Sequence, residues 1–160
     1  MAKAKANKPI EKGSKAPIIK LKDHLSREFD LAGCRGKKVL LSFHPLAWTR
    51  VCAMQMKSLE ANQPKFEWLG TVAVGVSVDS VPSKAAWAKE LGIGRTRLLC
   101  DFWPHGRAAE ILGIFRRQSG VSERANIIVD AKGKVRWIKV YPVAELPDIE
   151  EAIAALSSSA

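Results

Sequence analysis

Apolar residues occur along the chain in two patterns, as short continuous runs and at helical spacing, and these patterns distinguish its strands from its helices. Continuous apolar or β-branched runs bounded by turn residues predict buried strands. The strongest runs are VLLSF (39–43), TVAVGVSVD (71–79) and ANIIVD (125–130). A turn at AKGK (131–134) joins the last run to VRWIKVY (135–141), which predicts a β-hairpin near the end of the chain.

Helical spacing of apolar residues occupies the segments between these strands. Cys52, Met56 and Leu59 recur at helical spacing and predict a helix that ends near Pro64. Ser83 is the expected N-cap of the next helix. Further helical patterns cover residues 83–92, 107–115 and 147–156.

The order of these elements predicts an α/β fold with a mixed central sheet flanked by helices on both faces. Two short strands, PIIKLKD (17–23) and REFDL (27–31), precede the strong runs and predict an N-terminal hairpin extension. We expect a single domain over residues 16–157, preceded by a basic flexible tail over residues 1–15. There is no G-x-G-x-x-G phosphate loop, so no nucleotide cofactor is indicated.

Composition narrows the class of protein. Hydrophobic residues make up 47% and charged residues 26%, as in ordinary globular proteins, and no apolar run approaches the roughly 20 residues needed to cross a bilayer. The lysine-rich start has no apolar stretch after it, so it predicts neither a secretory signal nor a mitochondrial presequence. Cys34, Cys52 and Cys100 form neither close pairs nor an even set, which favours a reducing compartment. We therefore expect a cytoplasmic protein without membrane association.

The net charge of +10 raises the question of an anionic partner. Five lysines against one glutamate leave residues 1–15 at +4, so much of the excess lies in the predicted tail. A basic tail can contact nucleic acid. However, no aromatic residue interleaves these lysines to form a stacking platform. We therefore prefer a solvated tail and keep nucleic-acid binding as the alternative.

Cys52 is the candidate for covalent chemistry. It follows a buried strand and a break at Pro45, and it falls in the first turn of the predicted helix. Unpaired N–H groups and the positive end of the helix dipole at that position favour a thiolate. Free cysteines are also often small, buried and inert, so position alone leaves both interpretations open.

Three further residues favour chemistry at Cys52. Pro45, Thr49 and Cys52 form a P-x-x-x-T-x-x-C arrangement, in which the loop can fold the Thr49 hydroxyl back onto the sulfur. Arg124 precedes a core strand that can lie beside the first, which would bring a permanent cation to the thiol. The structural alternatives are that Thr49 only caps the helix and that Arg124 pairs with a surface carboxylate.

These residues carry a family resemblance that extends along residues 16–155. FHPLAWTRVC (43–52) resembles the peroxidatic loop of the peroxiredoxins, the AhpC/TSA family of thiol peroxidases in the thioredoxin-like superfamily. GVSVDSVPSKAAWAKELGI (75–93) resembles the family's second core strand and following helix. LLCDFWPHGRAAEILGIF (98–115) resembles a block of the AhpE-like one-cysteine bacterial members. SERANIIVDAKGKVRW (122–137) resembles the strand that carries the family's active-site arginine.

The resemblance implies a thioredoxin-like fold and a role for each site residue. Cys52 would be the peroxidatic cysteine, which forms a sulfenic acid, Thr49 its hydroxyl partner, Pro45 the residue that shields the site and Arg124 the active-site arginine. The substrate would be hydrogen peroxide or an organic hydroperoxide, and no cofactor or metal is implied. Many members have an acidic residue three positions after the cysteine; Gln55 stands there, so we expect altered tuning.

The histidines are not convincing metal ligands, since His24, His44 and His105 belong to different segments. Trp48 and Trp103 lie in loops, and exposed together they would form an apolar patch. The resemblance makes a homodimer through such loops plausible.

Regeneration of the thiol is the open half of the predicted cycle. Some members of the family have a resolving cysteine five residues after the peroxidatic one, but Lys57 occupies that position here. No cysteine follows Cys100. Cys100 is expected to be a packing residue and Cys34 a spectator, with a resolving role as the alternative for either. We therefore expect an external thiol, either a small molecule or a thioredoxin- or glutaredoxin-like protein. The rival function is a peroxide sensor or holdase that uses Cys52 oxidation as a signal.

Overall fold

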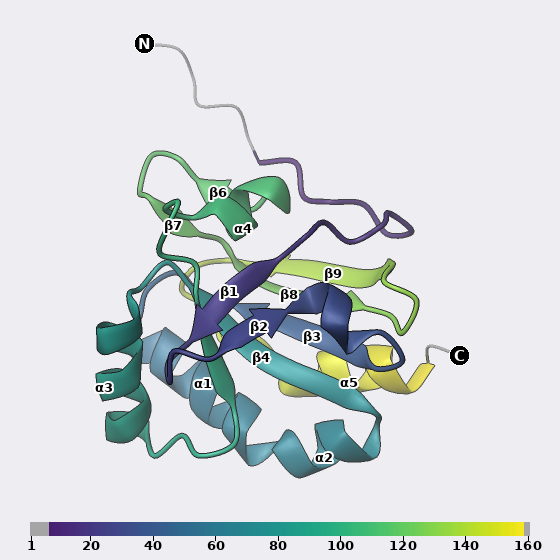
Figure 1. Cartoon of the computed structure of the whole chain (residues 1–160), viewed down its shortest axis with the longest axis horizontal. Coiled ribbons are helices and arrows are strands. Elements are labelled where there is room, and N and C mark those ends of the chain that lie inside the picture. The colour runs from purple at the N-terminus through teal and green to yellow at the C-terminus, as the bar shows by residue number, and fades with distance from the viewer. Residues whose placement is uncertain (1–6, 159–160) are drawn as a thin grey trace.

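A seven-stranded mixed sheet forms the centre of the computed structural model, which describes residues 7–158 (Figure 1). Its strand order is β2-β1-β5-β4-β3-β8-β9, and a separate two-stranded sheet pairs β6 with β7. The strands are β1 (Lys20–Asp23), β2 (Glu28–Asp30), β3 (Lys38–Phe43), β4 (Thr71–Ser77), β5 (Arg97–Cys100), β6 (Phe115–Arg116), β7 (Val121–Ser122), β8 (Arg124–Val129) and β9 (Val135–Tyr141). The helices are η1 (Leu31–Cys34), α1 (Arg50–Ala61), α2 (Gln63–Trp68), α3 (Val81–Leu91), α4 (Arg107–Ile111) and α5 (Ile149–Ser158).

Strand β3 lies between β4 and β8, and this arrangement determines what surrounds its carboxyl end. β3 pairs with β4 in parallel and with β8 in antiparallel orientation. The antiparallel register sets Phe43 opposite Ala125, so the chain enters β8 at the edge where it leaves β3. Arg124, the first residue of β8, therefore lies beside the loop that leads from β3 to α1.

Helices cover both faces of the sheet, as the alternating pattern predicts. Helices α1, α2, α3 and α5 contribute to one buried cluster, which includes Cys52, Trp87 and Leu156. On the other face, α4 packs with residues of the N-terminal segment and η1. Figure 1 places α4 and the β6–β7 ribbon above the sheet and α1, α2 and α5 below it. The expected mixed sheet between two helical layers is confirmed.

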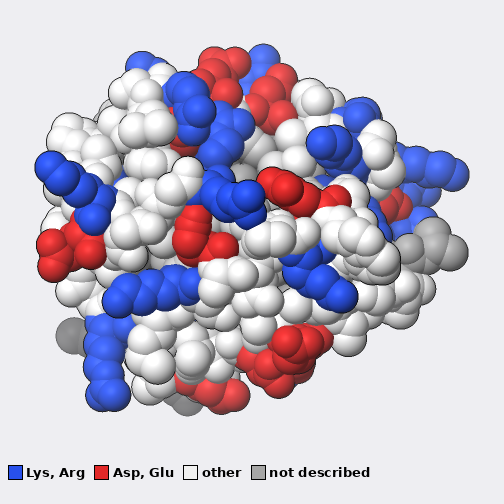
Figure 2. Space-filling model, turned by 90° about the horizontal axis from the view of Figure 1, so that it is seen from below, with Lys and Arg blue, Asp and Glu red and all other residues white. Residues whose placement is uncertain are grey.

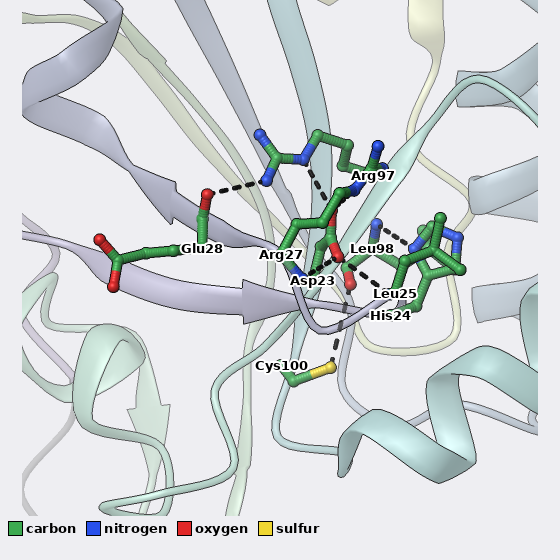
Figure 3. Close-up of polar contacts among 8 residues, drawn as sticks. All are labelled: Asp23, His24, Leu25, Arg27, Glu28, Arg97, Leu98 and Cys100. Atoms are coloured by element: carbon green, nitrogen blue, oxygen red, sulfur yellow. Dashed lines mark hydrogen bonds and ion pairs between the residues drawn. The ribbon is translucent and has the colours of Figure 1, made fainter.

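The N-terminal hairpin extension is also confirmed, and a buried carboxylate fastens it to the sheet. β1 pairs with β2 and with β5, both antiparallel. Asp23, which is fully buried, accepts hydrogen bonds from the Nε atoms of Arg27 (3.0 Å) and Arg97 (2.8 Å), as Figure 3 shows. Burial alone would raise the pKa of Asp23, but the hydrogen bonds from Arg97, Arg27 and Leu25 outweigh it and lower that pKa.

The end of α1 and the cap of α3 differ from the sequence expectations. Pro64 does not end helical structure; α1 ends at Ala61, and Pro64 occupies the first turn of the short helix α2, where its missing N–H is tolerated. The cap of α3 is Ser80 rather than Ser83, since the Ser80 hydroxyl accepts the Ser83 N–H at 3.4 Å. Ser83 therefore keeps its own hydroxyl for another partner.

Part of the predicted tail is joined to the domain. The Ile10 N–H donates to the carbonyl of Leu112 at 3.0 Å, and the Gly13 N–H donates to the carbonyl of Val135 at 2.7 Å. Residues 7–15 thus run along the folded body instead of extending freely from it. The boundary at residue 16, and the flexibility of residues 1–6, which lie outside the described residues, stay predictions.

Candidate active site

Cys52 occupies the third position of α1 and is almost completely buried, with an exposed fraction of 1%. Thr49 is the N-cap of this helix, and no side-chain hydrogen bond caps it. The thiol therefore lies among first-turn N–H groups that have no intrahelical partner. This environment favours a negative charge on sulfur.

Arg124 reaches the sulfur from the neighbouring strand. Its Nη1 atom lies 3.4 Å from Cys52 Sγ, and the side chain has an exposed fraction of 3%. Its Nε and Nη2 atoms donate to the carbonyl of Val143 at 3.0 and 2.8 Å. These bonds fix the plane of the guanidinium, so the cation is held against the sulfur instead of pairing with a surface carboxylate.

Gln55 orients Arg124 from the next turn of α1. The amide oxygen of Gln55 accepts from Arg124 Nη1 at 2.8 Å, and its Nε2 donates to Ser42 Oγ at 2.8 Å and to the carbonyl of Phe43 at 3.1 Å. The Ser42 hydroxyl donates in turn to Asn126 Oδ1 at 2.8 Å. A buried polar chain thus runs from β8 through β3 to the arginine. Sequence reasoning had noted Gln55 only as a departure from a family pattern.

Thr49 and Pro45 lie in the loop before Cys52. The Thr49 hydroxyl donates to the carbonyl of Leu46 at 2.7 Å, which closes a local turn, and the residue is exposed. This bond neither caps the helix nor reaches the sulfur. Pro45 is buried and supplies no N–H. The structure therefore brings Arg124 to Cys52 directly, whereas Thr49 and Pro45 lie in the loop that precedes it.

The same loop is fastened to the β4–α3 side of the molecule by two hydrogen bonds. Asp79 accepts the Ala47 N–H at 2.9 Å, and Trp48 Nε1 donates to Ser83 Oγ at 3.0 Å. Trp48 has a φ of +68°, which is strained for a bulky side chain. These tethers hold the loop in a conformation that it would not adopt by itself.

The other two thiols lie in environments that disfavour the thiolate. Cys34 is half-buried at the end of η1, and burial raises its pKa. Cys100 ends β5 with an exposed fraction of 7%, and its Sγ lies 3.9 Å from the carbonyl of Leu98 (Figure 3). Burial raises the pKa of Cys100 to about 11. Neither thiol matches the cationic helix-end setting of Cys52.

An exposed aromatic surface lies near the amino end of α3. Trp48 and Trp103 have exposed fractions of 55% and 81%. Phe102 and Trp103 border a cavity of about 340 Å³ together with Val81 and Cys100. None of the helices formed by residues 7–158 is long and apolar enough to span a membrane.

Known proteins resemble this chain over nearly its whole length. A model of the AhpC/TSA family matches residues 12–138. Alkyl hydroperoxide reductase E of Mycobacterium tuberculosis is 35% identical over 150 residues, which cover 91% of this chain and 97% of that protein. Peroxiredoxin-2 of Pongo abelii is 33% identical over 150 residues, which cover 88% of this chain and 84% of that protein.

Solved structures show the same fold. The reduced 2-Cys peroxiredoxin of Plasmodium vivax gives a TM-score of 0.84 at 28% identity and covers 94% of this chain and 82% of its own. AhpC of Enterococcus faecalis gives a TM-score of 0.85 at 21% identity over 92% and 90% of the two chains, which supports the fold alone. The thioredoxin-like α/β fold expected from the sequence is confirmed.

Proposed function

The chain belongs to the AhpC/TSA family of peroxiredoxins, and from that membership we propose a role for each residue of its thiol site. It is a thiol-dependent peroxidase. We propose that Cys52 is the peroxidatic cysteine and that Arg124, Thr49 and Pro45 complete the site. The observation that carries this assignment is the 3.4 Å contact between Arg124 Nη1 and the buried sulfur at the start of α1.

In the first half-reaction the Cys52 thiolate attacks one oxygen of hydrogen peroxide or an organic hydroperoxide. The S–O bond forms as the O–O bond breaks, the sulfur is oxidised by two electrons to a sulfenic acid, and the other oxygen leaves as water or an alcohol after it takes a proton. Arg124 stabilises the charge that develops on the leaving oxygen. Thr49 would orient the peroxide once its hydroxyl turns from Leu46 toward the substrate, and Pro45 would limit access to the sulfur.

In the second half-reaction an external thiol attacks the sulfenic sulfur and releases water, which leaves a mixed disulfide on Cys52. A second thiol then frees Cys52 and leaves with the first as a disulfide. The raised pKa values of Cys34 and Cys100 support this one-cysteine cycle, because a protonated thiol is a poor nucleophile. The reductant would be a small-molecule thiol or a thioredoxin- or glutaredoxin-like protein.

A peroxide sensor or holdase that uses Cys52 oxidation only as a signal is not favoured. The relatives carry the names alkyl hydroperoxide reductase E and peroxiredoxin-2, and the first of these names is that of a reductase. Within residues 7–158 we find no feature that argues for a stoichiometric sensor instead.

Assembly and location are also proposals. A homodimer would cover the exposed aromatic surface of Phe102 and Trp103, which is large for a solvated loop. We propose the cytoplasm as the location because the described cysteines, Cys34, Cys52 and Cys100, are all free thiols. Its partners in the reaction would then be a peroxide and a thiol reductant.

Steady-state peroxide consumption with a thiol reductant tests the proposed function. Wild type should turn over repeatedly, Cys52→Ser should be inactive, and Cys34→Ser should remain near wild type. A single stoichiometric oxidation of wild type without turnover would support the sensor instead. Full activity in Cys52→Ser would remove Cys52 from the chemistry.

A further inference from the structure

Lys84 is a fully buried lysine, with an exposed fraction of 0%, on the first turn of α3. Its Nζ atom lies 2.6 Å from His44 Nε2 and donates to Ser77 Oγ at 2.8 Å. The ammonium also lies 5.1 Å from the centre of the Trp87 ring. Lysine is rarely buried so completely without a direct ion pair, because removing its charge from water is costly.

The contacts of Lys84 connect the loop that precedes Cys52 to the end of β4, where Ser77 lies. His44 is the residue directly before Pro45. The Ser77 hydroxyl donates to Asp79 Oδ2 at 2.6 Å, and the same carboxylate oxygen accepts the Ala47 N–H at 2.9 Å. Together with the Trp48–Ser83 bond, these contacts fasten the loop to the β4–α3 side at three points.

The protonation states within this cluster follow from the hydrogen bonds. Lys84 can donate only to an unprotonated nitrogen, so His44 accepts at Nε2 and carries its proton on Nδ1, which lies 3.4 Å from the carbonyl of Ser42. Burial, and then the charge of Lys84, lower the pKa of His44 well below its ordinary value. His44 is therefore neutral, and the positive charge of the cluster resides on Lys84.

We propose that Lys84 is a positioning residue of the peroxidase site, which fastens the loop before Cys52 through His44 and supplies a second buried positive charge to the sulfur. Arg124 contacts Cys52 from β8, on one side of β3, and Lys84 contacts Ser77 of β4, on the other side of β3. This inference rests on the proposed function, because it assigns Lys84 to the chemistry of Cys52. Under this proposal two cations, Arg124 and Lys84, stabilise the Cys52 thiolate instead of Arg124 alone.

The charged and titratable groups around Lys84 support this coupling. Burial lowers the pKa of Lys84 to about 8, while Asp79, Cys100 and Cys52 act in the opposite direction. Burial lowers the pKa of His24, and the charge of Lys84 acts in the same direction. Lys84 is thus mostly an ammonium at neutral pH and loses its charge as the pH rises through about 8.

The test compares Lys84→Met with Lys89→Met, since Lys89 is an exposed lysine on the same helix. The readout is the rate of Cys52 alkylation against pH, followed by mass analysis of the peptide that contains Cys52. Lys84→Met should move the midpoint of this profile upward by about one pH unit, the size of a charge pair across a partly desolvated site. Lys89→Met should leave it in place. An unchanged midpoint in a folded Lys84→Met protein would overturn the proposal, because a packing role would not shift it.

A second measurement does not depend on the Lys84 variant folding. Nitrogen NMR of the Lys84 ammonium in the otherwise unchanged protein should show a titration that moves to lower pH in Cys52→Ser, because the thiolate stabilises the ammonium reciprocally. Equal titrations in the two proteins would refute the coupling. Peroxide turnover is measured on the same wild-type sample: its absence would remove the proposed function, while the alkylation profiles would still decide the role of Lys84.

Discussion

Gln55 leaves the charge of Arg124 undiminished at the sulfur. Within the described residues, the hydrogen bonds of Arg124 go to Cys52, Gln55 and the carbonyl of Val143, none of which is a carboxylate side chain. An amide oxygen orients the guanidinium without neutralising it. An acidic side chain at position 55 would form an ion pair with Arg124 and weaken its field. We therefore expect Gln55 to leave the charge of Arg124 available to Cys52.

Replacing the arginine should slow oxidation of the thiol. Arg124→Ala removes the donor to Cys52 and leaves the Gln55 oxygen without its partner. A hydrogen bond to a charged group is worth about 1.5–3 kcal/mol, so we expect the second-order rate with peroxide at neutral pH to fall roughly 10- to 100-fold. Stopped-flow measurement of a single oxidation against pH would give both the rate and its midpoint.

Arg50→Ala is the matched control for this variant. Arg50 is the first residue of α1 and is exposed, so solvent screens its charge. We expect its loss to change the rate by less than about threefold. Equal losses in the two variants would mean that helix-end charge in general, and not the contact of Arg124 with the sulfur, governs the reaction.

Sequence reasoning reached Cys52 and Arg124 because each follows from a local pattern, a helix start and a strand start. It could not reach the buried partners. Ser42 and Asn126 appeared only as polar positions in strand patterns, and their pairing requires β3 to lie beside β8. Lys84 appeared as an ordinary helix lysine, since its burial depends on how α3 packs over β4 and on the loop that it holds.

At the scale of elements, Asp23 joins the N-terminal hairpin to the sheet, and acid should loosen it. The pKa of Asp23 lies below its ordinary value of 3.8 in the folded state. Its ionised form therefore adds stability at pH values above about 4, and that contribution is lost as the pH falls through the lowered folded pKa. The hairpin strands β1 and β2 are the elements that should respond first.

Asp23→Asn should lower the free energy of unfolding at pH 7 by about 2 kcal/mol, because it weakens the charge-assisted bonds from Arg27 and Arg97. Urea unfolding at pH 7 and at pH 3 would measure it, and the difference from wild type should shrink at the lower pH. Glu28→Gln, at an exposed position of the same hairpin, should change little at either pH. A difference for Asp23→Asn that stays constant with pH would contradict the linkage.

The strands were more predictable than the helix boundaries. The apolar runs of β3, β4 and β8 are continuous because helices cover both faces of the sheet there. Runs this short, bounded by turn residues, indicate buried strands instead of helices. The sequence does not predict helix α2, because its second residue is a proline. Proline can end one helix or begin another, and the pattern around Pro64 is interpreted as an end. The Ser80 cap was missed because two serines lie three residues apart.

At the scale of the whole molecule, the positive charge does not gather on the face that Figure 2 shows. Lysine and arginine side chains are interspersed there with acidic ones. Four of the ten net positive charges come from residues 1–15. The net charge of the whole chain therefore overstates how strongly the rest of the molecule would attract a polyanion. Nothing in this face argues for nucleic acid as a partner.

The exposed aromatic surface should control assembly. Trp103→Glu puts a charge where the proposed dimer would bury an 81% exposed indole, so we expect a monomer instead of a particle of twice 17.5 kDa. Trp68→Glu is the control, since Trp68 is 78% exposed on α2, which is not among the elements that border the Trp103 cavity. Sedimentation velocity would measure both. A wild-type monomer, or a dimer that survives Trp103→Glu, would reject this interface.

The central claim is that Cys52 alone receives oxygen from peroxide and holds it as a sulfenic acid until an external thiol arrives. Intact-mass analysis after one equivalent of peroxide, with a sulfenic-acid trapping reagent present, tests that claim directly. We predict one adduct per chain, located on Cys52 by peptide mapping, and no adduct in Cys52→Ser. Adduct on Cys34 or Cys100, or a mass loss of two protons that links Cys52 to either thiol, would contradict the account.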